Sequence, residues 1–182
     1  MKKFKCKSVM ALVLSMILFT GNSVTADAYT TLGLTWSSST ITYYYENYNS
    51  NRAKSYFETG ASGWSSTDVN FVKGNSANYN IYCTEVYNEN VEWDGLTNHN
   101  PSWGIHFERQ VLQLNYASTR TWNNDKALQS VVIHEFGHCL GLDHTLGKVI
   151  MNPYTWGDES RYGAYSIFTI QTDDRNGANA LY

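Results

Sequence analysis

Cysteine, proline and long apolar runs are scarce in this sequence of 182 residues. Its three cysteines are too few for a disulfide framework, so the fold must be stable through the packing of its core. A single bridge between Cys83 and Cys139 stays open, although Cys139 lies where a small buried apolar residue is expected. The two prolines form no Pro-rich linker, and no repeat or charged run divides the chain after residue 28. We therefore predict one folded domain over residues 29–182.

Residues 1–28 resemble a secretory signal. Four lysines precede an apolar run over residues 9–20, and Ala26, Asp27 and Ala28 supply a small-x-small cleavage site. A membrane anchor is the alternative, but the run is shorter than the roughly 18 residues that favour a spanning helix. We therefore predict a secreted, extracellular protein that has no stable membrane insertion once the signal is cleaved.

Basic residues are also few. The sequence has 13 Lys and Arg against 16 Asp and Glu, which gives a formal net charge of −3. Removal of the lysine-rich signal makes the remainder more acidic still. Nucleic acids and anionic membranes bind clustered basic residues, so neither is an expected partner.

The stretch HEFGHCLGLDH carries the chemistry of the chain. On an α-helix, His134 and His138 lie four residues apart and about 40° from each other around the axis, so both imidazoles point the same way. Two histidines at this spacing can bind one zinc ion, and Glu135 between them can act as a general base. A helix that ends at Gly141 in the left-handed conformation lets His144 return as a third ligand. Three protein ligands leave a fourth position for water, which is the arrangement of a catalytic zinc.

Periodicity predicts the elements that hold this stretch. We expect a helix that begins at residues 123–125 and runs to Leu140, with an apolar stripe that faces the core and turns the histidines toward a cleft. A helix that runs to about Trp64, capped by Asn49 or Ser50, should precede it, and a last helix should start at a Thr172 cap. The predicted strands cover residues 40–45, 69–73, 78–84 and 110–116, with one short edge strand within 87–107 and an extended segment at 166–169.

These residues resemble a known family. HEFGHCLGLDH followed by Met151 is similar to the metzincin signature H-E-x-x-H-x-x-G-x-x-H with its Met-turn. Within that clan the chain is most similar to the matrixins, including bacterial secreted members, through Gly137, through Trp36 with the following TITYYY, and through the ending TDDRNGANALY. The resemblance implies an α+β metzincin catalytic domain over residues 29–182. Such a domain has a twisted mixed sheet with two helices above the cleft and a small C-terminal subdomain with one helix.

The resemblance also implies a function and its residues. It points to a secreted zinc metalloendopeptidase in which His134, His138 and His144 bind one catalytic Zn²⁺ and Glu135 is the catalytic base. Gly141 makes the turn between ligands, and Met151 forms a floor beneath the metal. Pro153 and Tyr154 begin the wall of the pocket that receives the residue after the scissile bond. The expected partner of this monomer is a protein or peptide substrate bound extended along an edge strand.

The chain also departs from the matrixin pattern. Matrixins usually carry a structural zinc and calcium sites, but His99 and His106 lack the ligand pattern, so we predict surface histidines and no second zinc. Calcium could bind through Glu92 or Asp94, although no ligand spacing supports it. We also expect neither an inhibitory pro-segment before Trp36 nor a targeting domain after residue 182, and thus an enzyme that is active from the start or restrained by a separate inhibitor.

Two other functions remain open. The domain could be a zinc-containing binding module, which the intact Glu135 argues against, or a narrow peptidase that acts on short peptides or one partner. A further expectation depends on signal cleavage after Ala28. In that case the new amino group of Tyr29 would pair with Asp173, as matrixin N-termini pair with the corresponding aspartate.

Overall fold

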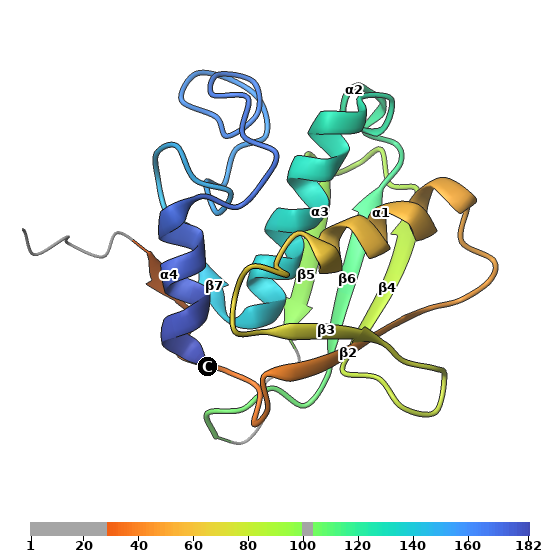
Figure 1. The fold of residues 1–182 in the computed structure, drawn as a ribbon. Coiled ribbons are helices and arrows are strands. Elements are labelled where there is room, and N and C mark those ends of the chain that lie inside the picture. The colour runs from red at the N-terminus through yellow and green to blue at the C-terminus, as the bar shows by residue number, and fades with distance from the viewer. Residues whose placement is uncertain (1–28, 100–103) are drawn as a thin grey trace, which may run out of the picture.

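The computed structural model describes residues 29–99 and 104–182, so the predicted signal at 1–28 lies outside the described residues (Figure 1). Its centre is a five-stranded sheet with the spatial order β3-β2-β4-β6-β5. The strands are β2 (Thr40–Tyr45), β3 (Asn70–Lys73), β4 (Ile81–Val86), β5 (Gly95–His99) and β6 (Gln110–Asn115). All neighbours pair in parallel except β5, which is antiparallel and forms the short edge strand that was predicted within 87–107. The mixed sheet confirms the predicted α+β class.

Alternation along the strands directs one face of the sheet toward the helices. In β2, Ile41, Tyr43 and Tyr45 are buried, while the residues between them are more exposed. Leu112 and Leu114 of β6 are buried on the same face, as is the polar residue Gln110. Cys83 and Cys139 are both buried and free, so the structure contains the packed thiols and not the disulfide that the sequence left open.

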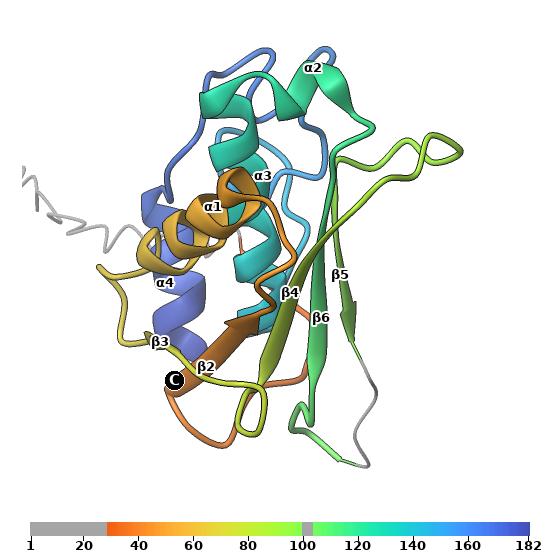
Figure 2. The ribbon, with the colours of Figure 1, turned by 90° about the vertical axis from the view of Figure 1, so that its right-hand side faces the viewer.

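Two helices cover this face of the sheet (Figure 2). They are α1 (Asn51–Ser62), which the Ser50 side chain caps as predicted, and α3 (Asp125–Leu140). Gly60 allows α1 to lie close to α3, because a Cβ there would overlap the side chains of Val132 and Phe136. The glycine that weakens the helix locally therefore has a packing role. In the part of the chain that the structure describes, no helix is long and apolar enough to cross a membrane.

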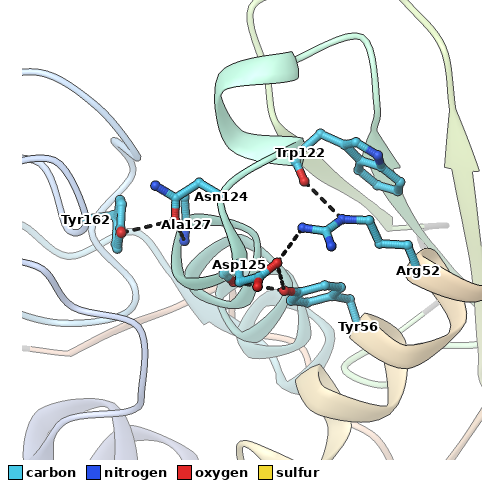
Figure 3. A network of polar contacts seen from close by, with 7 residues as sticks. All are labelled: Arg52, Tyr56, Trp122, Asn124, Asp125, Ala127 and Tyr162. Atoms are coloured by element: carbon cyan, nitrogen blue, oxygen red, sulfur yellow. Dashed lines mark hydrogen bonds and ion pairs between the residues drawn. The ribbon is translucent and has the colours of Figure 1, made fainter.

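A polar network anchors the first turn of α3 (Figure 3). From α1, Arg52 donates to the Asp125 carboxylate at 2.7 Å and to the carbonyl oxygen of Trp122 at 3.0 Å. Trp122 ends the short helix α2 (Thr119–Trp122). The Asn124 side chain caps α3 and also accepts a hydrogen bond from the Tyr162 hydroxyl at 3.1 Å. The helix that carries the histidines is thus held from both sides.

The last part of the chain is mostly irregular. Strand β7 (Leu142–Asp143) pairs with β1 (Thr30–Thr31), and no helix or strand follows until α4 (Thr172–Leu181). Figure 1 shows this irregular segment and α4, in blue, on the opposite side of α3 from α1. This is the predicted C-terminal subdomain with one helix.

Two local predictions for this region are wrong. The predicted extended segment at 166–169 does not begin at Ser166, because the Ser166 amide bonds back to the carbonyl oxygen of Tyr162 and Ser166 has a φ of 55°. The cap of α4 is Gln171 and not Thr172, because the Asp174 carboxylate reaches back to the Gln171 amide at 2.7 Å. Because of this bond, the helix cap lies one residue earlier in the chain than predicted.

Candidate metal centre

Helix α3 ends in the turn that the motif predicts. Gly141 has φ 104° and ψ 9°, and its amide donates to the carbonyl oxygens of Gly137 and His138. A Cβ at this position would overlap the carbonyl oxygen of Leu34. Glycine is therefore required both for the left-handed backbone and for the close approach of the N-terminal segment. After this turn the chain reverses along β7 and places His144 opposite the helix.

Three imidazoles converge as the sequence predicts. The Nε2 atom of His138 lies 3.1 Å from Nε2 of His134 and 3.1 Å from Nε2 of His144. The Nδ1 atoms of His134 and His138 lie 2.8 and 2.9 Å from the carbonyl oxygens of Ile150 and Leu142. A carbonyl oxygen only accepts, so both Nδ1 atoms carry the proton and both Nε2 lone pairs face the centre. Burial lowers the pKa of all three histidines, which favours neutral rings.

This donor set fits a small divalent cation. Lone pairs only 3.1 Å apart repel one another unless a positive ion lies between them. Zinc–nitrogen bonds of about 2.0–2.1 Å in a tetrahedron place ligand nitrogens about 3.3–3.4 Å apart, close to the observed separations. Imidazole nitrogens are also preferred ligands of zinc. Within residues 29–99 and 104–182, these histidines are the one group of three or more metal-binding side chains.

Glu135 is buried next to these rings and held by a residue from the edge strand. The Thr97 hydroxyl donates to Oε2 of Glu135 at 2.8 Å. Burial raises the pKa of Glu135 to about 7. Gly95, two residues before Thr97, leaves room for the carboxylate, because a Cβ there would lie 2.9 Å from Oε1. The sequence alone did not single out either strand residue as part of the site.

Met151 and Asp174 form the turn beneath the helix. Gly137 lies between His134 and His138 in the sequence of α3. The Met151 sulfur lies against Gly137, and a Cβ at Gly137 would overlap this sulfur. The Asp174 carboxylate accepts from the amides of Ile150 and Met151 at 2.9 and 3.1 Å. Burial raises the pKa of Asp174 to about 6. The ion pair predicted from the sequence involves the neighbouring Asp173 and the amino group that signal cleavage would create at Tyr29. That pairing stays a prediction.

A cavity of about 670 Å³ adjoins the histidines. His134, Glu135, Pro153 and Tyr154 line it together, so the two residues predicted to form a pocket wall do lie beside the centre. Arg161 lines it as well and is only 2% exposed, with its pKa lowered by burial to about 10. No pattern in the sequence identified Arg161, because its place depends on how the irregular segment folds back.

The histidines outside the motif differ from each other. His106 is exposed, as predicted. The prediction of a surface position for His99 is wrong, because His99 is half-buried at the end of β5, stacks on Phe107 and lines the cavity. Of the two residues considered for calcium, Asp94 accepts hydrogen bonds from the hydroxyls of Ser118 and Thr121, and Glu92 is exposed. These contacts do not test whether calcium binds here, so calcium binding through Glu92 or Asp94 stays untested.

Comparison with known proteins agrees with this geometry. The sequence pattern of the family described as matrixin matches residues 35–182. This chain belongs to the matrixin family. Over 108 residues it is 30% identical to a protein named matrix metalloproteinase-C from Caenorhabditis elegans, and the match covers 48% of this chain and 19% of that relative. The match thus spans about a fifth of the relative's length.

Membership confirms the predicted family and the fold class. Matrixins are zinc-dependent metallopeptidases, and this matrixin has a three-histidine group that could bind a metal. Gly95, Thr97, Asp174 and Arg161 are site residues that the sequence alone did not identify, and His99 was wrongly predicted to lie at the surface. Asp174 carried a partial signal, since the paired aspartates at the start of α4 were expected to favour the helix dipole.

Proposed function

We propose that this matrixin is a secreted zinc metalloendopeptidase. The observation that carries the proposal is the convergence of three Nε2 atoms, with that of His138 3.1 Å from each of the other two, in the lining of a cavity that Glu135 also lines. A structural zinc site would be closed by a fourth protein ligand. No fourth His, Cys, Asp or Glu joins the three histidines in the described residues, and this favours a site with an open position.

His134, His138 and His144 would hold the zinc ion as neutral imidazoles. Bound zinc supplies Lewis acidity, which lowers the pKa of a water molecule and polarises a peptide carbonyl. The protein contributes the orientation of the ligands. The carbonyl oxygens of Ile150 and Leu142 fix the tautomer and the ring angle of two histidines, and such contacts also raise the basicity of the ligating nitrogen.

Glu135 is proposed to move the proton. Thr97 occupies Oε2, so Oε1 is the oxygen that is available to accept a proton from the attacking water. A carboxylate at this position can then deliver the same proton to the nitrogen of the leaving amine.

The substrate is proposed to bind as an extended chain along β5. This strand is at the edge of the sheet, and Gly95, Leu96 and Thr97 line the cavity beside the histidines. An edge strand offers unpaired backbone groups to a peptide that adds to the sheet. Export of the enzyme rests on the signal-like residues 1–28, which lie outside the described residues.

Glu135→Gln tests the proposal. Glutamine keeps the shape of the side chain and an oxygen that can accept from Thr97, so fold and zinc content should stay unchanged. Loss of the base should lower kcat on an unfolded protein such as casein by about 10²–10⁴-fold. Glu108→Gln, at an exposed residue outside the cavity, is the matched control and should be as active as the wild type.

The substrate and the response to a chelator separate the remaining functions. Chelator-sensitive cleavage of casein supports the proposed endopeptidase. Cleavage of short peptides alone would indicate a narrow peptidase. Zinc binding without cleavage of either substrate would contradict the proposal.

A further inference from the structure

The proposed reaction does not use the buried guanidinium of Arg161. Arg161 lines the cavity together with His134 and Glu135 and is 2% exposed. Its Nη1 donates to the carbonyl oxygen of Asn152 at 2.8 Å, and its Nη2 donates to the Thr155 hydroxyl at 2.8 Å. Its Nε is buried and has no hydrogen-bond partner. Part of the donor set of this cation is therefore unsatisfied.

The negative charges of Glu135 and Asp94 partly offset the effect of burial on the pKa of Arg161, but no carboxylate of the cavity forms an ion pair with it. Glu92, Asp94 and Glu135 are the acidic residues that line the cavity. The Asp94 and Glu135 carboxylates already accept hydroxyl hydrogen bonds, and Glu92 is exposed. None of the three forms an ion pair with Arg161, since the ion pairs among the described residues involve other side chains. Buried charges in proteins are normally paired, and this one has no direct ion-pair partner among the described residues.

The Nε without a partner belongs to the edge of the guanidinium that can bind a carboxylate. A guanidinium presents Nε–H and one Nη–H side by side, and this edge binds the two oxygens of a carboxylate in parallel. Both oxygens that Arg161 does contact, those of Asn152 and Thr155, are neutral. Because the Nε is buried, a substrate carboxylate would bond it only after the atoms that cover it shift, and it would then be the direct ion-pair partner of Arg161.

We propose that Arg161 makes this cavity selective for an acidic side chain, glutamate or aspartate, directly after the scissile bond. The inference rests on the proposed peptidase function and on the cavity walls. A peptide whose scissile carbonyl lies at the three histidines places the flanking side chain in the adjoining cavity. Arg161 acts there as a specificity-determining residue and takes no part in the chemical step.

The test compares peptides that differ only in the residue after the scissile bond, which is Glu, Gln or Leu. For the wild type, kcat/KM should be about tenfold or more higher with Glu than with Gln, as expected for a charge-assisted hydrogen bond. In Arg161→Gln this Glu-to-Gln ratio should fall to about one. A wild-type ratio near one, a preference for Leu over Glu, or an unchanged ratio in the variant would overturn the inference.

Arg120→Gln is the matched control. Arg120 also lines the cavity but is exposed, and its guanidinium lies 3.8 Å from the centre of the Trp156 ring. Loss of this solvated charge should leave the Glu-to-Gln ratio within about twofold of the wild type, because exposed charges are screened. An equal loss of preference in both variants would contradict a specific role of Arg161.

Two further measurements keep the test decisive. If Arg161→Gln does not fold, Arg161→Lys retains a charge but not the parallel donors, so its ratio should fall while staying above one. An unchanged ratio in the lysine variant would overturn the two-donor contact. A purely structural role of Arg161 would lower both rates equally and leave the ratio as it is. If the wild type cleaves no peptide, the proposed function fails, whereas cleavage without a preference for Glu overturns only this inference.

Discussion

Replacing Gly141 with alanine tests whether the turn after α3 determines how the three histidines meet. The φ of 104° is a conformation that a residue with a Cβ adopts only under strain, at about 1–3 kcal/mol. The added Cβ would also overlap the carbonyl oxygen of Leu34, and overpacking of this kind costs about 1–3 kcal/mol more. We therefore expect Gly141→Ala to lower the free energy of unfolding by about 2–6 kcal/mol.

Gly157→Ala is the control for this variant. Gly157 has a similar φ of 101°, but no heavy atom lies within 4 Å of an added Cβ, so the change introduces strain without overlap. Urea unfolding and zinc titration of both variants give the comparison. Relief of the overlap should shift β7 and with it His144, so zinc affinity should fall at least about tenfold in Gly141→Ala alone. Equal unfolding midpoints and equal zinc affinities for the two variants would refute this reasoning.

Three other changes test separate contacts. Thr97→Val removes the hydroxyl bond to Glu135, so it should lower kcat/KM and should lower the free energy of unfolding by about 1–3 kcal/mol. Thr97→Ser should keep both values. An unchanged kcat/KM in the valine variant would contradict the role of Thr97 in positioning Glu135. Asn124→Ala removes the cap of α3 and should cost about 1 kcal/mol in urea unfolding without changing the zinc content; a cost near zero would show that the cap is not needed. Burial raises the pKa of the thiols of Cys83 and Cys139, so at about pH 8 both should resist alkylation in the native protein. Both should react after unfolding without a reductant, and mass spectrometry counts the labels. Rapid labelling of the native protein would contradict the burial of these two thiols.

The metal ligands were predictable because local geometry brings them together. His134 and His138 share a helix face through their spacing, and the left-handed turn at Gly141 requires only one residue of the right type. The strands and the two large helices were also predicted from periodicity, although α3 is buried on almost every side and not on one face alone. The predicted cap of α4 was wrong by one residue. The Asp174 carboxylate accepts from the amide of Gln171, so Gln171 and not Thr172 caps the helix.

The residues that complete the site were not predictable, because they meet across long separations in the chain. Thr97 reaches Glu135 from a strand 38 residues away, at a position that the sequence placed in a loop with one edge strand. Arg161 lies in a segment without periodicity, so nothing indicated that it would be buried beside the centre. From the sequence, His99 was predicted to be a polar surface residue. In the structure it pairs with Gln110 at the end of β5 and lines the cavity. Contacts of this kind depend on the assembled fold.

Zinc K-edge X-ray absorption on the zinc-loaded protein tests the central claim most directly. The proposed site contains one zinc per chain, bound by His134, His138 and His144 with one further light-atom ligand. The spectrum should show three imidazole nitrogens at about 2.0–2.1 Å and no sulfur. A sulfur ligand at about 2.3 Å, which would involve a cysteine, or fewer than three imidazoles, would contradict the account.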